Sequence, residues 1–361
     1  MIETDALVIG AGPVGLFQVF QLGLLGLKAE AIDVLPHPGG QCMALYADKP
    51  IYDVPGVPVC TGRELTELLL RQASPFLPVD AASGLRQHLH LGHLVSSLQA
   101  DGAHWLVGTD HGLQVRARAV FVAAGAGAFV PRGLGVAELD GALNLHHHLP
   151  DPAQAVTHAP PWAGRHLVVA GGGDEALSAV IALANPSVAA HRPALLTLLH
   201  RREQFQAEPH LEAAVRQLID RGEIAFEVGL PQGADRLDGA PGHTVQALHL
   251  LGADSQTRRL AFDHIMVRLG LSPKLGPLTQ WGMDLERKQV AVSPARFTSS
   301  LPGIYAVGDI NTYPGKKRLL LCGFHEATLA AHDAVVALNP NAPPHLLYTT
   351  TSPVLHQRLG V

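Results

Sequence analysis

Three glycines near the N-terminus have the spacing of a dinucleotide-binding turn. Gly10, Gly12 and Gly15 form a G-x-G-x-x-G pattern that follows a short apolar run. The first glycine permits a tight bend, the second lets the main chain approach a pyrophosphate, and the third lets the next helix pack on the strand. A helix expected from Pro13 would direct its N-terminal amides at the phosphates. Asp33 ends the next expected strand, where a carboxylate binds ribose hydroxyls, so the sequence predicts a nucleotide site here.

A second motif of the same kind lies near mid-chain. Gly171 and Gly173 follow the apolar segment 166–170, and Asp174 and Glu175 come next, at the start of an expected helix. Strand, turn and helix thus repeat the arrangement of the first motif. We assign these four residues to a second nucleotide site, and two nucleotides in one chain suggest that a hydride passes between them.

The end of the following strand distinguishes the two pyridine nucleotides. Where the first motif has an acid, this strand ends in His200, Arg201 and Arg202. Arginines bind a 2′-phosphate through charge-assisted hydrogen bonds, whereas a carboxylate would repel it. The sequence therefore predicts NADPH as the second nucleotide. The alternative is that the two arginines form only a solvated strand end.

A third pattern, Gly308-Asp309, ends an apolar strand in the last quarter of the chain. It would place a carboxylate at the carboxyl edge of a sheet, where ligands bind in open α/β folds. Asp309 could then bind a polyol chain. A Gly-Asp pair is also a common structural turn, and the sequence leaves both readings open.

These motifs must be positioned by two similar series of elements. Apolar runs that alternate with glycine turns and helices are typical of βαβ units. We expect buried strands at 5–9, 28–33, 119–125, 166–170, 195–199, 263–269 and 304–309. We expect helices from about 13, up to about 184 and over 323–338, and antiparallel strands at 89–98, 105–109, 114–122 and within 225–262. The predicted fold class is α/β, with two Rossmann-like three-layer domains.

The second series repeats the first as an inserted copy. The predicted first domain therefore covers 1–130 and 272–361, and the inserted domain covers 131–271. The tail from 340 has no strong helical period. We expect it to be ordered only where it packs on something.

Composition limits the class of protein. The chain of 361 residues is 47% hydrophobic and 16% charged, which indicates a packed globular protein of two domains. Its net charge of −5 argues against broad binding to nucleic acid. The apolar run 16–27 is too short to span a membrane. The three cysteines are far apart, so we expect neither disulfides nor a zinc site, and we expect a cytoplasmic protein.

Further stretches of the chain match a family of flavoproteins. With the two glycine motifs, segments 39–46, 51–56, 125–132 and 308–317 resemble the two-domain flavoprotein disulfide reductases, whose nearest large group is the thioredoxin reductases. Within that group the chain is most similar to the thioredoxin-reductase-like ferredoxin–NADP⁺ reductases. The resemblance implies FAD in the first domain and NADPH in the inserted one.

The same resemblance assigns residues to the FAD. Asp33 would bind its ribose, Asp309 its ribityl chain, and Tyr46 would stack on the isoalloxazine ring. The resemblance implies further FAD contacts from the first domain: Gly10, Gly12, Pro13, Gly15, Gly40, Gln41, Val95, Phe129 and Thr351. It also implies a homodimer in which the tail of one subunit covers the flavin of its partner.

Three departures from the family pattern matter. Thioredoxin reductases carry a C-x-x-C before the second glycine motif, and the segment 146–157 has no cysteine. Gln206 replaces an arginine of the family, which would weaken the preference for NADPH over NADH. Thr349 aligns with a ring-stacking histidine of the family, and Tyr348 could supply the stacking instead.

The sequence thus predicts a reductase that passes electrons from NADPH through FAD to ferredoxin or flavodoxin. No catalytic side chain is expected, because the cofactors carry the hydride. Two alternatives stay open: a thiol-disulfide reductase that works through Cys42, and a protein that binds both nucleotides without turnover. We expect Cys42 to be buried and inert, because free cysteines are mostly buried.

Two clusters invite other readings. Adjacent side chains point in different directions, so we do not expect a metal at His146-His147-His148. The basic run Lys316-Lys317-Arg318 could steer an acidic electron carrier to the flavin, or it could be a solvated loop.

Overall fold

The computed structural model describes residues 1–147, 149, 159–185, 191–239, 242–341 and 345–361, with the main chain alone at 128–131 and 271–274. The chain divides into two compact units, residues 1–129 with 273–361, and residues 130–272. Each boundary lies one residue from the position that the sequence predicts. The chain passes between the units in β9 (Ala128–Pro131) and β18 (Leu271–Lys274), which pair with each other.

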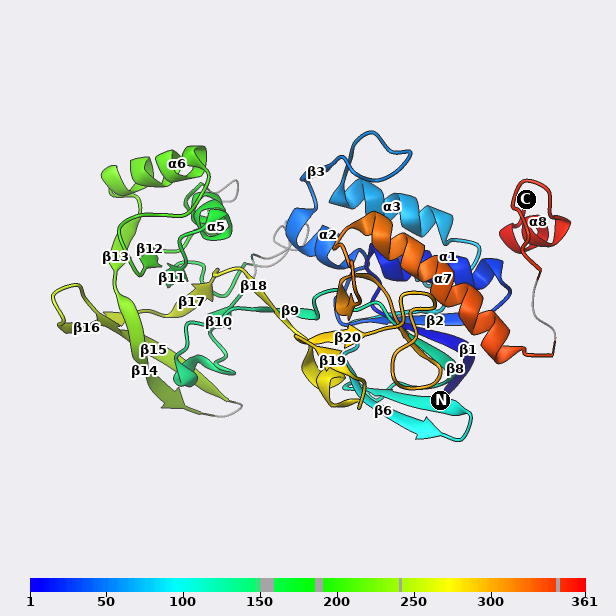
Figure 1. The fold of residues 1–361 in the computed structure, drawn as a ribbon. Coiled ribbons are helices and arrows are strands. Elements are labelled where there is room, and N and C mark those ends of the chain that lie inside the picture. Colours follow the sequence, from blue (N-terminus) through cyan, green and yellow to red (C-terminus); the bar gives the residue numbers. More distant parts are fainter. Residues whose placement is uncertain (148, 150–158, 186–190, 240–241, 342–344) are drawn as a thin grey trace. The chain divides into compact units, whose positions relative to one another are not determined.

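The first unit is built on a seven-stranded sheet (Figure 1). Its strands, in spatial order, are β5 (Leu89–Leu91), β2 (Ala29–Asp33), β1 (Ile2–Ile9), β8 (Gln114–Val122), β7 (His104–Thr109) and β6 (Val95–Asp101). The seventh strand, β21 (Ile304–Ala306), lies parallel to the C-terminal half of β8, while β7 lies antiparallel to its N-terminal half. One long strand therefore belongs both to a parallel sheet and to an antiparallel meander.

Alternation along the strands separates two cores in this unit. Ala6 and Val8 of β1 face the core under the helices, whereas Leu7 and Ile9 face the opposite core. The helices α3 (Gly62–Gln72), α1 (Pro13–Leu24) and α7 (Leu320–Leu338) cover the first face, as Figure 1 shows. The shorter elements of the unit are α2 (Gly40–Tyr46), β3 (Pro50–Ile51), β4 (Cys60–Thr61), η3 (Gly276–Gln280), β19 (Leu285–Glu286), β20 (Gln289–Ala291), η4 (Gly308–Ile310) and β22 (Asn311–Thr312).

Two strand predictions are wrong in this unit. The expected antiparallel strand 89–98 is two strands, of which β5 lies parallel to β2 and β6 lies antiparallel to β7. The expected strands 114–122 and 119–125 are one strand, β8. Alternation of polar and apolar residues predicts a strand but not the direction of its neighbour, because either pairing buries the same face.

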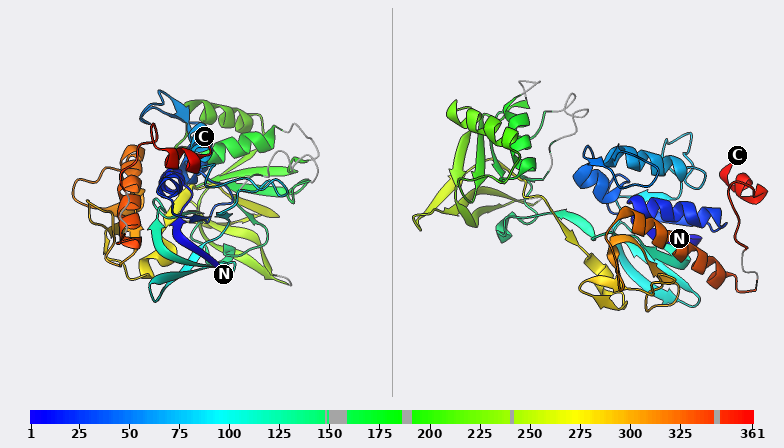
Figure 2. Two further views of the ribbon diagram at one scale, coloured as in Figure 1. Left: turned by 90° about the vertical axis from the view of Figure 1, so that its right-hand side faces the viewer. Right: turned by 45° about the horizontal axis from the view of Figure 1, so that its top comes forward.

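The tail contains a short helix that the sequence did not predict, α8 (Pro353–Leu359). Figure 2 shows it in red beside the dark-blue α1. The Arg358 guanidinium donates a hydrogen bond of 2.5 Å to the carbonyl of Leu24, and the side chain of Leu355 is buried. The end of the tail, 353–359, therefore packs on α1.

The second unit has a five-stranded parallel sheet of its own. Its order is β10 (Leu145–His146), β17 (His264–Val267), β11 (His166–Ala170), β12 (Leu195–His200) and β13 (Ala225–Val228). Leu167 and Val169 face a core with α5 (Asp174–Ala184) and α6 (Pro209–Asp220). Val168 and Ala170 face a second core with the antiparallel strands β14 (Leu230–Asp238), β15 (His243–Leu251) and β16 (Thr257–Ala261) and the turn η1 (Ala137–Leu139).

The antiparallel region of this unit is therefore shorter than the predicted 225–262, because β13 pairs in parallel with β12. Across the described part of the chain, no helix combines the length and the apolar character needed to cross a membrane.

Candidate functional site

A cavity of about 360 Å³ lies within the first unit. It opens at the carboxyl ends of β1, β2 and β8, which is the edge where open α/β sheets bind ligands. Nine of the residues that the sequence assigns to FAD line it: Gly10, Gly12, Pro13, Asp33, Gly40, Gln41, Tyr46, Val95 and Asp309. The fold thus brings segments from both ends of the chain to one cavity.

Glycines keep one wall of the cavity open. Gly10 has a φ of +111°, and a Cβ there would meet the carbonyl of Ala123. Gly40 has a φ of +51°, and a Cβ there would lie 2.9 Å from the Cα of Gly12. A Cβ at either position would clash with the main chain, so both turns require glycine. Gly15 does not line the cavity; a Cβ there would meet the carbonyl of Gly10, so it permits close packing of α1.

Asp33 is held rigidly at the rim. Its Oδ2 accepts a hydrogen bond of 2.6 Å from the amide of Ala11, and its Oδ1 accepts one of 2.8 Å from the amide of Leu35. Burial raises the pKa of this carboxyl, although the two amide hydrogen bonds oppose the shift. The carboxylate keeps lone pairs free toward the cavity, where hydroxyl donors would favour its charged form.

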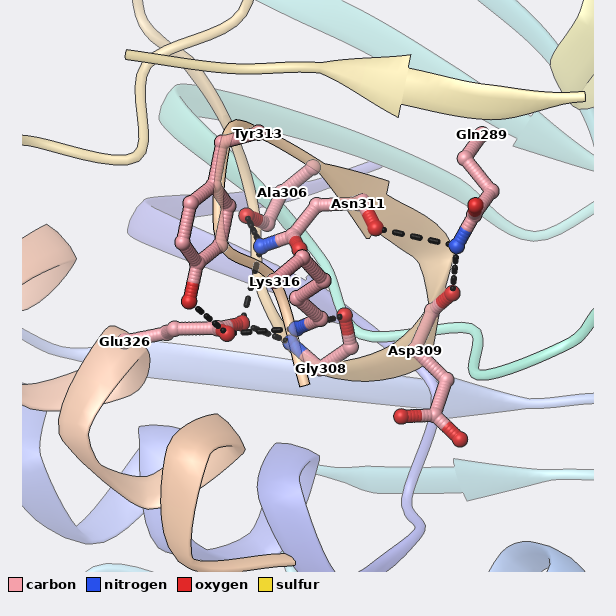
Figure 3. A network of polar contacts seen from close by, with 8 residues as sticks. All are labelled: Gln289, Ala306, Gly308, Asp309, Asn311, Tyr313, Lys316 and Glu326. Carbon is pink, nitrogen blue, oxygen red and sulfur yellow. Dashed lines mark hydrogen bonds and ion pairs between the residues drawn. The ribbon is translucent and has the colours of Figure 1, made fainter. Parts of the chain in front are cut away.

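Asp309 belongs to the turn η4. The Gln289 side-chain amide donates to the carbonyls of Asp309, at 2.9 Å, and of Asn311, at 3.0 Å. The Asp309 carboxylate points away from these contacts in Figure 3 and lines the cavity. The main chain is therefore fixed while the carboxylate stays available to a ligand.

Several cavity residues were missed by sequence reasoning. They include His93, Leu275, Pro277, Leu278, Trp281 and Arg318. The indole Nε1 of Trp281 is a buried donor without a partner among the described residues. Trp281 lies in the segment after β18, where the chain re-enters the first unit. No sequence motif identifies this segment, because only the tertiary structure brings it to the cavity.

Two tail residues assigned to the flavin do not line this cavity, and the side chain of a third assigned residue is not described. Phe129 is in β9, where side chains lie outside the described part of the structure. Tyr348 is 65% exposed, and Thr351 is also exposed; neither lines the cavity of its own chain. The assignment of Phe129 stays a prediction, and that of Tyr348 and Thr351 stays a prediction that requires a partner subunit.

The second glycine motif lies at the carboxyl end of β11. A Cβ on Gly172 would meet the ring of His200, so the turn packs directly on the end of β12. Burial lowers the pKa of His200, and the charges of Arg201 and Arg202 add to the effect. The two arginines are exposed, and within the described residues neither makes an ion pair or a side-chain hydrogen bond. This strand end therefore presents two free cations.

The acidic pair that follows the glycines already has partners in the protein. Asp174 Oδ1 accepts a hydrogen bond of 2.7 Å from the amide of Glu208, and Glu175 lies 3.6 Å from the guanidinium of Arg268. The amide of Gln206 donates to the carbonyl of Gly172 at 2.8 Å. Asp174 and Gln206 therefore fasten the loop after β12 to the glycine turn.

Comparison with known proteins identifies the family. The sequence signature of the pyridine nucleotide-disulphide oxidoreductases matches residues 4–334. The chain belongs to this family. It is 50% identical over 369 residues to the ferredoxin–NADP reductase of Paracidovorax citrulli, with 100% of this chain and 97% of that protein covered. It is 46% identical over 363 residues to ferredoxin–NADP reductase 2 of Cupriavidus metallidurans, with 100% and 92% covered.

Solved structures agree on the fold of this pyridine nucleotide-disulphide oxidoreductase. The bacillithiol disulfide reductase Bdr from Staphylococcus aureus has a TM-score of 0.60 at 13% identity, with 94% of this chain and 99% of that chain covered. The thioredoxin reductase of T. acidophilum has a TM-score of 0.54 at 18% identity, with 94% and 99% covered. FAD and NADP(H), the cofactors that the sequence predicts, are those of the family.

The oxidoreductase has no accessible thiol at its cavity. Cys42 lines the cavity but is buried, and burial raises the pKa of its thiol to about 11, with smaller contributions from Cys60 and Asp309. The thiolate is the reactive form of cysteine, so this thiol is poorly suited to a relay at neutral pH.

Both readings of the basic run assumed an exposed Lys316, and that assumption is wrong. Lys316 is not on the surface: its side chain is 8% exposed and pairs with the buried Glu326. It therefore cannot contact an electron carrier, and only Lys317 and Arg318 remain exposed there. A lysine next to other lysines gives no sequence signal for burial, because its acidic partner lies ten residues away on α7.

His146, the first residue of the histidine run, contacts another histidine of the second unit. His146 Nε2 lies 3.0 Å from Nδ1 of His264, and burial lowers the pKa of His146 to about 4. Among the described residues, which leave out His148, no group of three potential ligands converges on a metal site.

Proposed function

We propose that this chain is a ferredoxin–NADP reductase that takes electrons from NADPH and passes them through FAD to ferredoxin or flavodoxin. The observation that carries the proposal is the full-length identity of about one half to the curated ferredoxin–NADP reductases. The cavity of the first unit and the free arginines of the second add a site for each nucleotide.

The cavity fits FAD by its chemistry. A turn in which only glycine fits lets the main chain approach a pyrophosphate, and the helix α1 begins directly after it, where its N-terminal amides would favour an anion. Asp33 would bind ribose hydroxyls and Asp309 the ribityl hydroxyls. Trp281, whose N–H has no partner among the described residues, could donate to an acceptor of the cofactor. Gln41, Val95 and the partly exposed Tyr46 would complete the enclosure.

The second unit fits NADPH. Gly171 and Gly173 shape the turn before α5, and Arg201 and Arg202 are free to bind a 2′-phosphate. The lowered pKa of His200 keeps its ring neutral at neutral pH, so it can pack under the turn without adding charge. The preference for NADPH then depends on the two arginines.

FAD, when bound, supplies the conversion between hydride and single-electron chemistry. The residues of this chain would bind and orient the two nucleotides, and the thiol of Cys42, which lines the cavity, is poorly ionised at neutral pH. No side chain is needed as an acid or base for the hydride itself.

The thiol-disulfide reductase is the weaker alternative. Similarity to the solved disulfide reductases is below 25% identity and reports only the fold. A relay would need a reactive thiol, and the raised pKa of Cys42 argues against it.

We propose further that the enzyme is a cytoplasmic homodimer. Leu346, Leu347 and Tyr348 project from the tail with 64%, 44% and 65% of their surfaces exposed, which suits contact with a second subunit. The free thiols of Cys42, Cys60 and Cys322 suit a reducing compartment.

The test is anaerobic. Protein reduced with one equivalent of NADPH is mixed with oxidised ferredoxin, flavodoxin or thioredoxin, and reoxidation of the flavin is followed by absorbance. We expect fast reoxidation by ferredoxin or flavodoxin and none by thioredoxin. Fast reoxidation by thioredoxin alone would refute the proposal, and failure of NADPH to bleach the flavin would refute any reductase.

A further inference from the structure

The carboxylate of Glu326, on α7, is completely buried beneath the loop that follows β21. Four groups of this one loop donate hydrogen bonds to it, as Figure 3 shows: the amide of Gly308 at 2.7 Å, Nδ2 of Asn311 at 2.8 Å, the hydroxyl of Tyr313 at 3.0 Å and the ammonium of Lys316. A single helix residue thus contacts four residues within a stretch of nine, 308–316.

The ion pair at the centre of this network is not explained by stability alone. Lys316 and Glu326 are 8% and 0% exposed, and removing two charges from water is costly enough that a buried pair often contributes little net stability. Such pairs can instead specify one conformation. Here they would specify the conformation of the loop.

The conformation that the pair fixes is that of Gly308. Its N–H donates to Glu326, and its carbonyl accepts a hydrogen bond of 2.9 Å from Lys316. Gly308 has a φ of +78°, a conformation that other residues rarely adopt. Both main-chain polar groups of the residue before Asp309 are therefore held by the two partners of one ion pair.

Asp309 is the member of the loop that the network leaves free. Its carbonyl is held by Gln289, but its carboxylate has no hydrogen bond or ion pair among the described residues and lines the cavity. In Figure 3 it projects away from Glu326. The loop is held on the side of α7, and Asp309 lines the cavity.

We propose that Glu326 and Lys316 are positioning residues for FAD: by holding Gly308 they hold the carboxylate of Asp309 where the ribityl hydroxyls of the cofactor can donate to it. The inference rests on the proposed role of Asp309 in FAD binding. Neither Glu326 nor Lys316 lines the cavity, so they act only through the loop.

A structural role for Glu326 would give a different result, and α7 offers a matched control. Two turns later on the same helix, Asp333 accepts a hydrogen bond of 2.9 Å from the hydroxyl of Tyr305 in β21. This contact also ties α7 to the sheet, but it does not involve the loop. Tyr305→Phe therefore removes a hydrogen bond between α7 and the sheet, one that leaves the contacts of Gly308 in place.

The experiment measures the FAD dissociation constant of the full chain by equilibrium dialysis, together with the melting temperature without FAD. We expect Glu326→Gln to weaken FAD binding about ten-fold, and Tyr305→Phe to change it less than about two-fold even where both melt at similar temperatures. If Glu326→Gln does not fold, the double variant Glu326→Gln/Lys316→Met, which removes both charges together, is measured in its place. Unchanged FAD affinity in the folded variant overturns the inference.

A double-mutant cycle shows whether Glu326 acts through Asp309. We expect Asp309→Asn to weaken FAD binding, and Glu326→Gln/Asp309→Asn to bind FAD about as weakly as Asp309→Asn alone. Effects that multiply would refute a positioning role. Unchanged affinity in Asp309→Asn would refute the role of Asp309 and this inference with it, whereas wild-type protein that binds no FAD would refute the proposed function.

Discussion

The carboxylate of Asp33 and the amide of Ala11 are joined by a hydrogen bond of 2.6 Å, which ties the end of β2 to the glycine turn after β1. The residue proposed to bind ribose therefore also fixes the loop proposed to bind pyrophosphate. A change at Asp33 should therefore affect both the ribose contact and the position of the glycine turn.

This contact predicts that Asp33→Asn and Asp33→Ala differ. Asn retains one acceptor oxygen for Ala11 but loses the charge, and Ala loses both contacts. We expect FAD binding to weaken about ten-fold in Asp33→Asn and about a hundred-fold in Asp33→Ala, measured by fluorescence of released FAD. Equal affinities for the two variants would show that the contact with Ala11 contributes nothing to the site.

The free arginines predict nucleotide choice. Arg201→Ala/Arg202→Ala should raise the KM for NADPH by about ten-fold or more and leave the KM for NADH nearly unchanged, because only NADPH carries the 2′-phosphate. Steady-state kinetics with both nucleotides measures this. Arg221→Ala, an exposed arginine of the same unit that pairs with Glu223, is the matched control and should alter neither KM. Equal effects on both nucleotides would refute the assignment.

The buried carboxyl of Glu30 predicts a pH dependence of stability. Burial alone would raise its pKa, but hydrogen bonds from His90 at 2.9 Å and His88 at 2.8 Å lower it below the ordinary 4.5. The ammonium of Lys28 lies 3.7 Å from Oε1 of Glu30 and is a further positive charge beside this carboxyl. A lowered pKa means that the charged Glu30 stabilises the fold above the ordinary glutamate pKa, and that this contribution is lost as pH falls through the folded pKa.

Glu30→Gln should therefore lower the free energy of unfolding at pH 7 by roughly 1–3 kcal/mol. The difference from wild type should shrink as pH falls below about 4.5, the ordinary pKa. Urea unfolding between pH 7 and pH 3.5 measures it. Glu67→Gln, an exposed glutamate on α3, should show no such difference at any pH. A difference that stays constant with pH would contradict the assignment to ionised Glu30.

Cys42 should be dispensable for electron transfer. Cys42→Ser is expected to keep kcat with ferredoxin within about two-fold, since the raised pKa keeps the thiol protonated. In labelling with iodoacetamide at pH 8, the half-buried Cys322 should react before Cys42 and Cys60, as mass spectrometry of peptides would show. Loss of turnover in Cys42→Ser would instead favour the thiol relay.

Much of the nucleotide chemistry could be predicted from local sequence. Gly10, Gly12 and Asp33 lie in one βαβ unit, so their spacing along the chain determines their arrangement in space. The family comparison confirmed the two cofactors that these motifs predict. The roles of the individual residues stay predictions.

What the sequence by itself determined is therefore the two local motifs, the insertion of one domain in the other and the cofactors. The tertiary structure decided what depends on distant partners: the direction of β5 beside β2, the place of Trp281 at the cavity, and the burial of Lys316. A lysine in a basic run looks solvated until an acid on another element accepts its charge. Glu326 does so, because the packing of α7 on the sheet places its carboxylate beneath the loop that carries Asp309.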